Sequence, residues 1–183
     1  MKRSLNEVQT LVLKAGRGAG LPLGLAQDLS DAVPWMGRAI EQLPEALAVS
    51  GAPNLPQRGA GGVVFERCRA VVDGPSALDL ARAGTGQAVE LRDIDATDIL
   101  QALIACNCAL TGKGMTVEKI GAQALRLTAT SEDLKTAPAR AQAPLEVDDA
   151  IWAQLVELAA KTFVPESEAS RASGAGAGLT DND

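Results

Sequence analysis

The sequence contains no histidine and no tyrosine, and its only aromatic residues are two tryptophans and two phenylalanines. Without histidine the chain cannot form a Ser-His-Asp or Cys-His nucleophile pair, nor the usual histidine-containing zinc and non-haem iron sites. So few aromatic rings also leave little surface for nucleic acid bases to stack on. The absence of histidine favours a binding or assembly protein over an enzyme, because catalysis would have to use carboxylates, lysines, arginines, a thiol or a helix N-terminus.

Positive charge and long apolar segments are scarce as well. The 17 lysines and arginines are outnumbered by 23 aspartates and glutamates, which gives a formal net charge of -6. Such a chain lacks the basic surface that drives non-specific nucleic acid binding. No apolar run approaches the roughly 20 residues of a bilayer-spanning helix, and no signal-peptide segment follows Lys2 and Arg3. We therefore expect a cytoplasmic protein without nucleic acid or membrane partners.

Cysteine is rare, and its number is odd. Three cysteines fit reduced thiols better than a disulfide framework. Cys106 and Cys108 lie two residues apart in a predicted helix, where such side chains point to different faces. They cannot share a metal ion there, so no metal site is predicted, and both are expected to be buried as small hydrophobic residues.

Glycine-rich stretches are present, but none matches a phosphate-binding loop. Residues 111–116 lack the first glycine of a P-loop and end a predicted helix instead of starting one. Residues 59–62 precede a predicted strand, which reverses the order of a dinucleotide-binding fingerprint. No helix is predicted after residues 174–178. The sequence therefore predicts no nucleotide and no other cofactor.

Local signals predict a helical unit over residues 1–49. A capping box at residues 4–7 precedes the first helix, which is expected to end in the glycine-rich stretch 15–20. Pro22 suits the first turn of a second helix, and Pro34 is expected to break or kink it before a third helical stretch. The unit should supply one helical part of the core.

The middle of the chain, residues 63–130, alternates between strand and helix patterns and is expected to form a small mixed or antiparallel sheet with a buried helix. An apolar helix, capped by Asp95 or Thr97, is expected to end at Gly112. The other expected elements are strands at 63–72 and 87–92, a turn at 73–76, a short helix at 77–83, and a hairpin of 115–121 with 124–130.

The C-terminal region, residues 148–183, begins with a predicted amphipathic helix over 148–163, after a linker at 131–147. Two neighbouring lines of apolar residues make its hydrophobic face wide, so we expect this face to be covered by the rest of the domain or by another chain. A glycine-rich tail follows. With helices at the ends and strands in the middle, the fold class predicted is α+β, with the three regions forming one domain.

Asp73 and Ser76 are the candidate binding residues in the middle of the chain. The Asp73-Gly74-Pro75-Ser76 sequence reads as a turn with a helix N-cap. The alternative is a strand-end loop in which Asp73 and the helix N-terminus bind an anionic ligand. Ser76 as a nucleophile has no support, because no base can be named and the flanking residues do not form a nucleophile elbow.

The two ends of the chain carry opposite charge. Residues 1–20 contain four basic residues and one acidic residue, whereas residues 164–183 contain four acidic side chains and one arginine. The hypothesis is that the tail docks on the N-terminal unit or on that of a neighbouring subunit. The alternatives are a flexible tail, because ordering glycine is entropically costly, and a loose cation site. The candidate residues for this contact are Lys14, Arg17, Arg171, Asp181, Asn182 and Asp183.

Three segments resemble a bacterial family known as domain of unknown function 3726. They are SLNEVQTLVLKAGRGAGLPLGLAQDLSDAVPWM at 4–36, VVDGPSALDLA at 71–81 and FVPESEASRASGAGAGLTDND at 163–183. The resemblance implies no activity and assigns no catalytic residue. It favours an ordered or ligand-ordered tail over a flexible one.

Three functions remain open from the sequence. The first is a small binding or assembly module, auxiliary to metabolism, that associates through its last helix and tail with a protein partner or with itself. The second is a histidine-free enzyme on a small anionic metabolite, using Arg17, Asp73, Arg171 and Asp181. The third is a homo-oligomer that exchanges its C-terminal tail between subunits.

Overall fold

The computed structural model describes residues 1–48, 52–59, 61–84, 87–141 and 143–163. Its strands are β1 (Lys2–Arg3), β2 (Gln57–Gly59), β3 (Gly62–Phe65), β4 (Ala88–Leu91), β5 (Lys113–Gly121), β6 (Ala124–Asp133) and β7 (Leu145–Glu146). Five of them form a mixed sheet in the order β2-β3-β4-β6-β5, in which only β3 and β4 run parallel. A separate two-stranded sheet pairs β1 with β7. The α+β class and the mixed sheet expected from the sequence are confirmed.

The first two helices are α1 (Leu5–Gly18) and α2 (Leu23–Met36). The predicted capping box is confirmed, because Ser4 Oγ accepts from the Glu7 amide at 3.3 Å and Glu7 Oε2 accepts from the Ser4 amide at 2.8 Å. Of the predicted break or kink at Pro34, a break at that residue is not found, although α2 ends only two residues later. Pro34 is buried inside α2, which continues to Met36 and ends where Gly37 takes a φ of 51°. Packing therefore outweighs the one helical hydrogen bond that proline removes.

The third helical stretch is present in two parts, a 3₁₀ helix η1 (Gly37–Gln42) and the short α3 (Leu43–Ala48). Pro44 lies in the first turn of α3, a position where proline costs little because the amide there has no helical partner. This part of the sequence prediction is confirmed.

The largest correction concerns residues 63–83. The predicted strand at 63–72 ends at Phe65, and α4 (Ala70–Ala83) runs through the predicted turn at 73–76. Arg67, with a φ of 50°, leaves the strand direction before the helix starts. Gly74 lies inside α4. A Cβ at this position would come within 3.1 Å of Leu100 Cδ1, so the glycine allows α4 and the helix that carries Leu100 to approach closely. Tertiary packing thus overrides the turn preference of Gly-Pro.

The buried helix is α5 (Thr97–Thr111), and it ends at Gly112 with a φ of 65°, as predicted. The expected cap by Asp95 or Thr97 is wrong: the N-cap residue is Ala96, without a side-chain cap. Asp95 Oδ1 accepts instead from the Ala70 amide at 2.8 Å and so caps the start of α4. The β5–β6 hairpin is confirmed, although β6 extends into the predicted linker.

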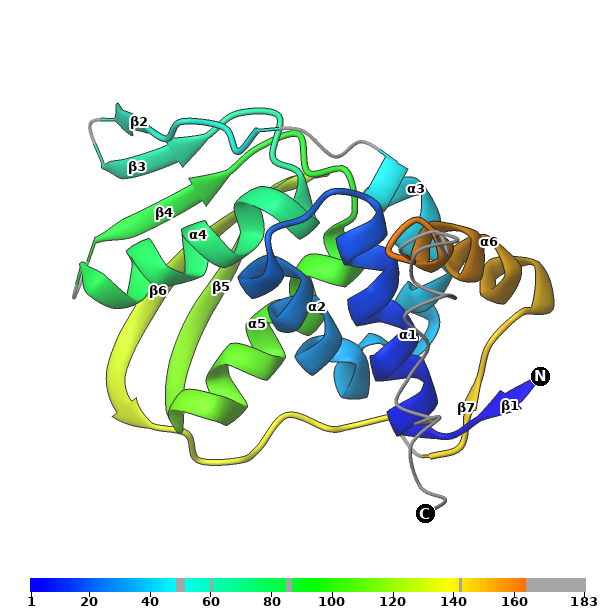
Figure 1. The fold of residues 1–183 in the computed structure, drawn as a ribbon. Coiled ribbons are helices and arrows are strands. Elements are labelled where there is room, and N and C mark those ends of the chain that lie inside the picture. The colour runs from blue at the N-terminus through cyan, green and yellow to red at the C-terminus, as the bar shows by residue number, and fades with distance from the viewer. Residues whose placement is uncertain (49–51, 60, 85–86, 142, 164–183) are drawn as a thin grey trace, which may run out of the picture.

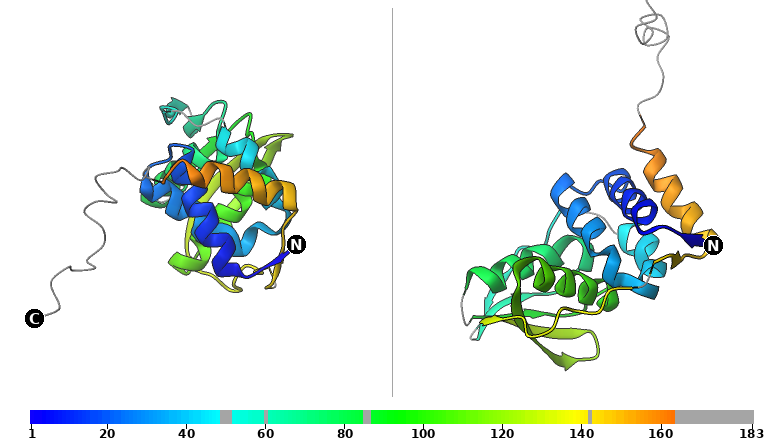
Figure 2. Two further views of the ribbon diagram at one scale, coloured as in Figure 1. Left: turned by 45° about the vertical axis from the view of Figure 1, so that its right-hand side comes forward. Right: turned by 90° about the horizontal axis from the view of Figure 1, so that it is seen from below.

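The helices stack in layers on one side of the sheet (Figure 1). Helices α4 and α5 cover one face, α2 packs on both of them, and α1 packs on α2. The last helix, α6 (Asp149–Ala160), has Asp148 as its N-cap and packs on α1, at the far end from the sheet (Figure 2). One continuous cluster of buried apolar side chains links these layers, and it includes Cys106 and Cys108 as predicted.

The opposite face of the sheet carries no helix among the described residues (Figure 2). None of the helices in the described ranges is long and apolar enough to cross a membrane.

Candidate functional site

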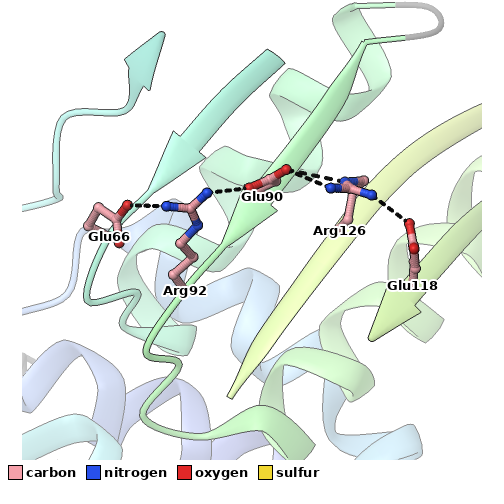
Figure 3. Close-up of polar contacts among 5 residues, drawn as sticks. All are labelled: Glu66, Glu90, Arg92, Glu118 and Arg126. Atoms are coloured by element: carbon pink, nitrogen blue, oxygen red, sulfur yellow. Dashed lines mark hydrogen bonds and ion pairs between the residues drawn. The ribbon is translucent and has the colours of Figure 1, made fainter. Parts of the chain in front are cut away.

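The uncovered face of the sheet carries a chain of five charged side chains, Glu66–Arg92–Glu90–Arg126–Glu118 (Figure 3). Arg92 reaches Glu66 at 2.9 Å and Glu90 at 2.7 Å, and Arg126 reaches Glu90 and Glu118 at 2.9 Å each. Strand register creates the chain, because Arg126 on β6 lies opposite Glu90 on β4 and Glu118 on β5. The three glutamates and two arginines therefore form one continuous row of ion pairs across three strands and the end of β3, with one negative charge in excess.

The central glutamate and the two arginines of the ion-pair chain are held in their charged forms. Hydrogen bonds from Arg92 and then Arg126 lower the pKa of Glu90. The same contacts raise the pKa values of both arginines. Groups that hold their charge so firmly are poor proton donors or acceptors near pH 7. The face also has no aromatic ring, since the four aromatic residues lie elsewhere, so it suits neither acid–base chemistry nor base stacking.

Asp73 is a structural hub and not an exposed ligand group. Its side chain is 0% exposed. Its carboxylate accepts from the Asn54 amide at 2.7 Å, from Asn54 Nδ2 at 2.9 Å and from the Arg69 amide at 2.9 Å. The Arg69 guanidinium lies 3.6 Å away. Donors of the chain itself thus surround the carboxylate and tie the segment before β2 to the start of α4.

Burial disfavours the thiolate form of Cys68 and Cys106. Burial, with smaller contributions from the nearby Asp73 and Asp95 charges, raises the pKa of Cys68 to about 12. Burial also raises the pKa of Cys106 to about 11, helped by Asp31 and then Asp28. Because the thiolate is the reactive form, neither group supplies the nucleophile that a histidine-free enzyme would need.

The remaining predicted site residues do not converge in the structure. Lys14 and Arg17 lie exposed on α1, where Arg17 Nη1 donates to the Leu21 carbonyl at 3.3 Å. Ser76 is half-buried inside α4 and makes no side-chain hydrogen bond with any described residue. Asp73 is sealed in the interior, so it cannot share an open site with Lys14 or Arg17. Arg171, Asp181, Asn182 and Asp183 lie outside the described residues, as does the proposed docking of the tail.

The outer face of α6 is the apolar surface that the sequence singles out and the structure leaves open. Its inner line, including Leu155 and Ala159, is buried against α1. The outer face consists of Ala153, Val156 and Ala160, with Phe163 just beyond the helix end, and the half-buried Trp152, which also packs on the core, lies at its margin. Val156 is 44% exposed and Phe163 is 67% exposed. The apolar face of α6 was predicted to be covered, and in the described residues only its inner line is covered, by α1.

Both ends of α6 are held firmly on the body of the protein. The Met1 ammonium donates to the Val147 carbonyl at 2.7 Å and lies 3.5 Å from Asp149. The Arg3 guanidinium stacks 4.2 Å from the centroid of the Trp152 ring. Gly18 of α1 comes so close to α6 that an added Cβ would overlap the Leu158 carbonyl oxygen. The outer face of α6 is therefore presented in a fixed orientation.

Sequence reasoning missed the ion-pair chain, although part of its signal was present. Glu90 and Arg92 alternate along a correctly predicted strand, and Glu118 and Arg126 belong to the predicted hairpin. Which charges become neighbours depends on cross-strand register, and a single sequence does not give that register.

Comparison with known proteins agrees with the resemblance noted above. Residues 3–50 match the model of a family described as a protein of unknown function, DUF3726. The match covers α1, α2, η1 and α3, and it confirms the resemblance over these helices. No curated protein and no solved structure matches the chain. Within the described ranges, no three Cys, Asp or Glu side chains are grouped so as to hold a metal ion.

Proposed function

We propose that the protein is an assembly module that pairs with a second copy of itself through the outer face of α6. The observation that carries this proposal is the exposed apolar surface of Val156 and Phe163 on the open side of a firmly anchored helix, with the half-buried Trp152 at its margin. Contiguous exposed apolar surface rimmed by polar residues is typical of interaction sites. Aromatic residues, here the exposed Phe163 and the half-buried Trp152, are enriched at such interfaces.

A second copy fits this face better than an unrelated partner because the face is self-complementary in an antiparallel arrangement. Antiparallel pairing about Val156 brings Ala153 of one copy near Ala160 of the other, and small residues let two helices approach closely. The acidic start of α6, at Asp148 and Asp149, then lies near the end that carries Lys161. Opposed helix dipoles favour the same orientation.

Cysteine chemistry supports a reducing compartment for this module, so we also propose a cytoplasmic location. Cys68, Cys106 and Cys108 are all free and buried. Disulfide-free proteins with buried thiols are typical of the cytosol.

Substitution of Val156 by aspartate tests the assembly. A charge in the centre of the paired face is costly to bury, so sedimentation velocity should show a dimer for the wild-type chain and a monomer for Val156→Asp. Phe163→Ser should weaken the dimer at its edge.

Leu55→Asp is the matched control, because Leu55 is an exposed apolar residue, 90% exposed, outside α6. It should leave the dimer intact. A wild-type chain that stays monomeric over the whole accessible concentration range, or a Val156→Asp variant that dimerises as tightly as wild type, would rule the proposal out.

A further inference from the structure

A small cavity lies where α2, α4 and α5 meet, away from both the ion-pair chain and the outer face of α6. Its volume is about 70 Å³, and its floor is formed by Leu78, Leu103 and Cys106. Three carboxylates, those of Asp28, Asp31 and Asp79, lie at its rim. An apolar cavity of about 150 Å³ holds benzene, so this one suits a chain of only a few carbon atoms.

The carboxylates at the rim have no cationic partner. In the described part of the chain, none of Asp28, Asp31 and Asp79 takes part in an ion pair, and only Asp31 accepts a side-chain hydrogen bond, from Gln27 Nε2 at 2.8 Å. Burial, then Asp79 and then Asp31 raise the pKa of Asp28. Arg140, which weakly affects Cys106, stacks 5.2 Å from the Trp35 ring centroid. The rim thus concentrates negative charge that the protein itself leaves uncompensated.

The cavity floor provides a second and independent feature. The Cys106 thiol is only 4% exposed, faces the cavity and has no hydrogen-bond partner among the described residues. Sulfur is a weak acceptor that tolerates both an N–H donor and an alkyl chain. Leu78 and Leu103 are 3% and 4% exposed and supply the apolar contact. An apolar floor with an unpaired acceptor and an acidic rim matches an amphipathic cation.

We propose that this cavity binds a short aliphatic chain ending in a protonated amine, either a free alkylamine or a lysine side chain. The alkyl part packs on Leu78 and Leu103, and the ammonium group lies between Asp28 and Asp79. A bare metal ion fits less well, since no group of carboxylates and thiols in the described ranges is arranged to hold one.

Titration of the full chain with n-butylammonium, followed by amide chemical shifts in NMR, tests the proposal. We expect saturable shifts confined to residues near the cavity, and at least a tenfold weaker affinity in Asp28→Asn and in Asp79→Asn. Both substitutions keep the side-chain shape, and circular dichroism checks that the variants fold. Glu157→Gln is the charge-matched control, because Glu157 lies exposed on α6 outside the cavity, and it should bind as wild type does.

Neutral butanol and anionic butyrate separate cation binding from simple apolar binding. Equal saturable shifts with butanol, undiminished binding by the two asparagine variants, or no saturable shift with any amine would overturn the proposal. A blocked lysine, Nα-acetyl-lysine methylamide, distinguishes the sources. Tighter binding of blocked lysine than of butylammonium assigns a lysine side chain, and the reverse assigns a free amine.

Discussion

Asp73 shows how one buried charge can organise a segment of chain. The carboxylate is fully buried, yet three N–H donors from Asn54 and Arg69 and the Arg69 guanidinium compensate it. A buried charge of this kind is tolerated only while all its partners are in place, because each of them would otherwise be left unsatisfied. Asp73 therefore serves the fold, and it is not open to a solvent-borne anion.

Substitution of Asp73 by alanine should lower the free energy of unfolding by roughly 3 to 5 kcal/mol, the usual cost of removing one partner of a buried charged network. Urea denaturation measures the loss. Asp98→Ala is the control, because Asp98 is exposed and accepts only one side-chain hydrogen bond, from Gln42. It should cost less than about 1 kcal/mol. A loss for Asp73→Ala as small as that of the control would contradict the structural role.

At the scale of elements, α1 and α6 are brought together by a missing side chain. An added Cβ on Gly18 would overlap the Leu158 carbonyl oxygen, and that oxygen belongs to the helix backbone, so it cannot move alone. The whole of α6 would have to shift. The position of the outer face of α6 thus depends on a glycine in the neighbouring helix.

Gly18→Ala should destabilise the protein by about 1 to 3 kcal/mol, as overpacking of a tight contact usually does. It should also weaken any dimer formed through α6. Gly24→Ala is the matched control in α2, where an added Cβ meets nothing within 4 Å. That variant should gain about 0.4 to 1 kcal/mol from reduced freedom of the unfolded chain. Thermal unfolding distinguishes the two, and equal effects of the same sign would refute the close contact.

The ion-pair chain predicts a pH dependence of stability with a definite sign. The pKa of Glu90 lies below its ordinary value of 4.5 in the folded protein, because two arginines donate to its carboxylate. Its contribution to stability is therefore complete above that value and is lost as the pH falls through the folded pKa. Wild type should exceed Glu90→Gln in unfolding free energy near neutral pH, and the difference should shrink in acid.

Unfolding by urea at a series of pH values measures this difference. Glu132→Gln serves as the control, because Glu132 is exposed and forms no ion pair among the described residues. Its difference from wild type should not follow the same course with pH. A Glu90→Gln difference that stayed constant from neutral pH into acid would show that the arginines do not hold the carboxylate.

The elements that could be predicted are those with signals close in sequence. The Ser4 capping box and Gly112 at the end of α5 act within a few residues, and both predictions were correct. The region around Gly74 was predicted as a turn, but it lies in α4, where Gly74 packs closely on Leu100, 26 positions along the chain. Nothing local reveals that contact.

The surfaces divide in the same way. The apolar face of α6 could be predicted, since its periodicity lies within one helix. The ion-pair chain could not, because strand register decides which charges meet. The acid-rimmed cavity gathers Asp28, Asp79 and Cys106 from three helices that only tertiary packing brings together.

On the scale of the whole molecule, the sheet and the helices are stacked in a fixed order from one end to the other. The sheet lies at one end, α4 with α5, α2 and α1 follow, and α6 closes the other end (Figure 2). The uncovered face of the sheet therefore points away from the proposed dimer contact. Pairing through α6 would hide neither the ion-pair chain nor the sheet edges.

This stacking order determines where the uncovered sheet faces would lie in a dimer. If two copies join through α6, their uncovered sheet faces lie at the two extremities and look outward in opposite senses. The pair becomes a double-ended connector, with the same surface offered on each end. A binder of that face that is itself multivalent would be cross-linked into an extended array, because the geometry places both faces beyond the reach of a single compact partner.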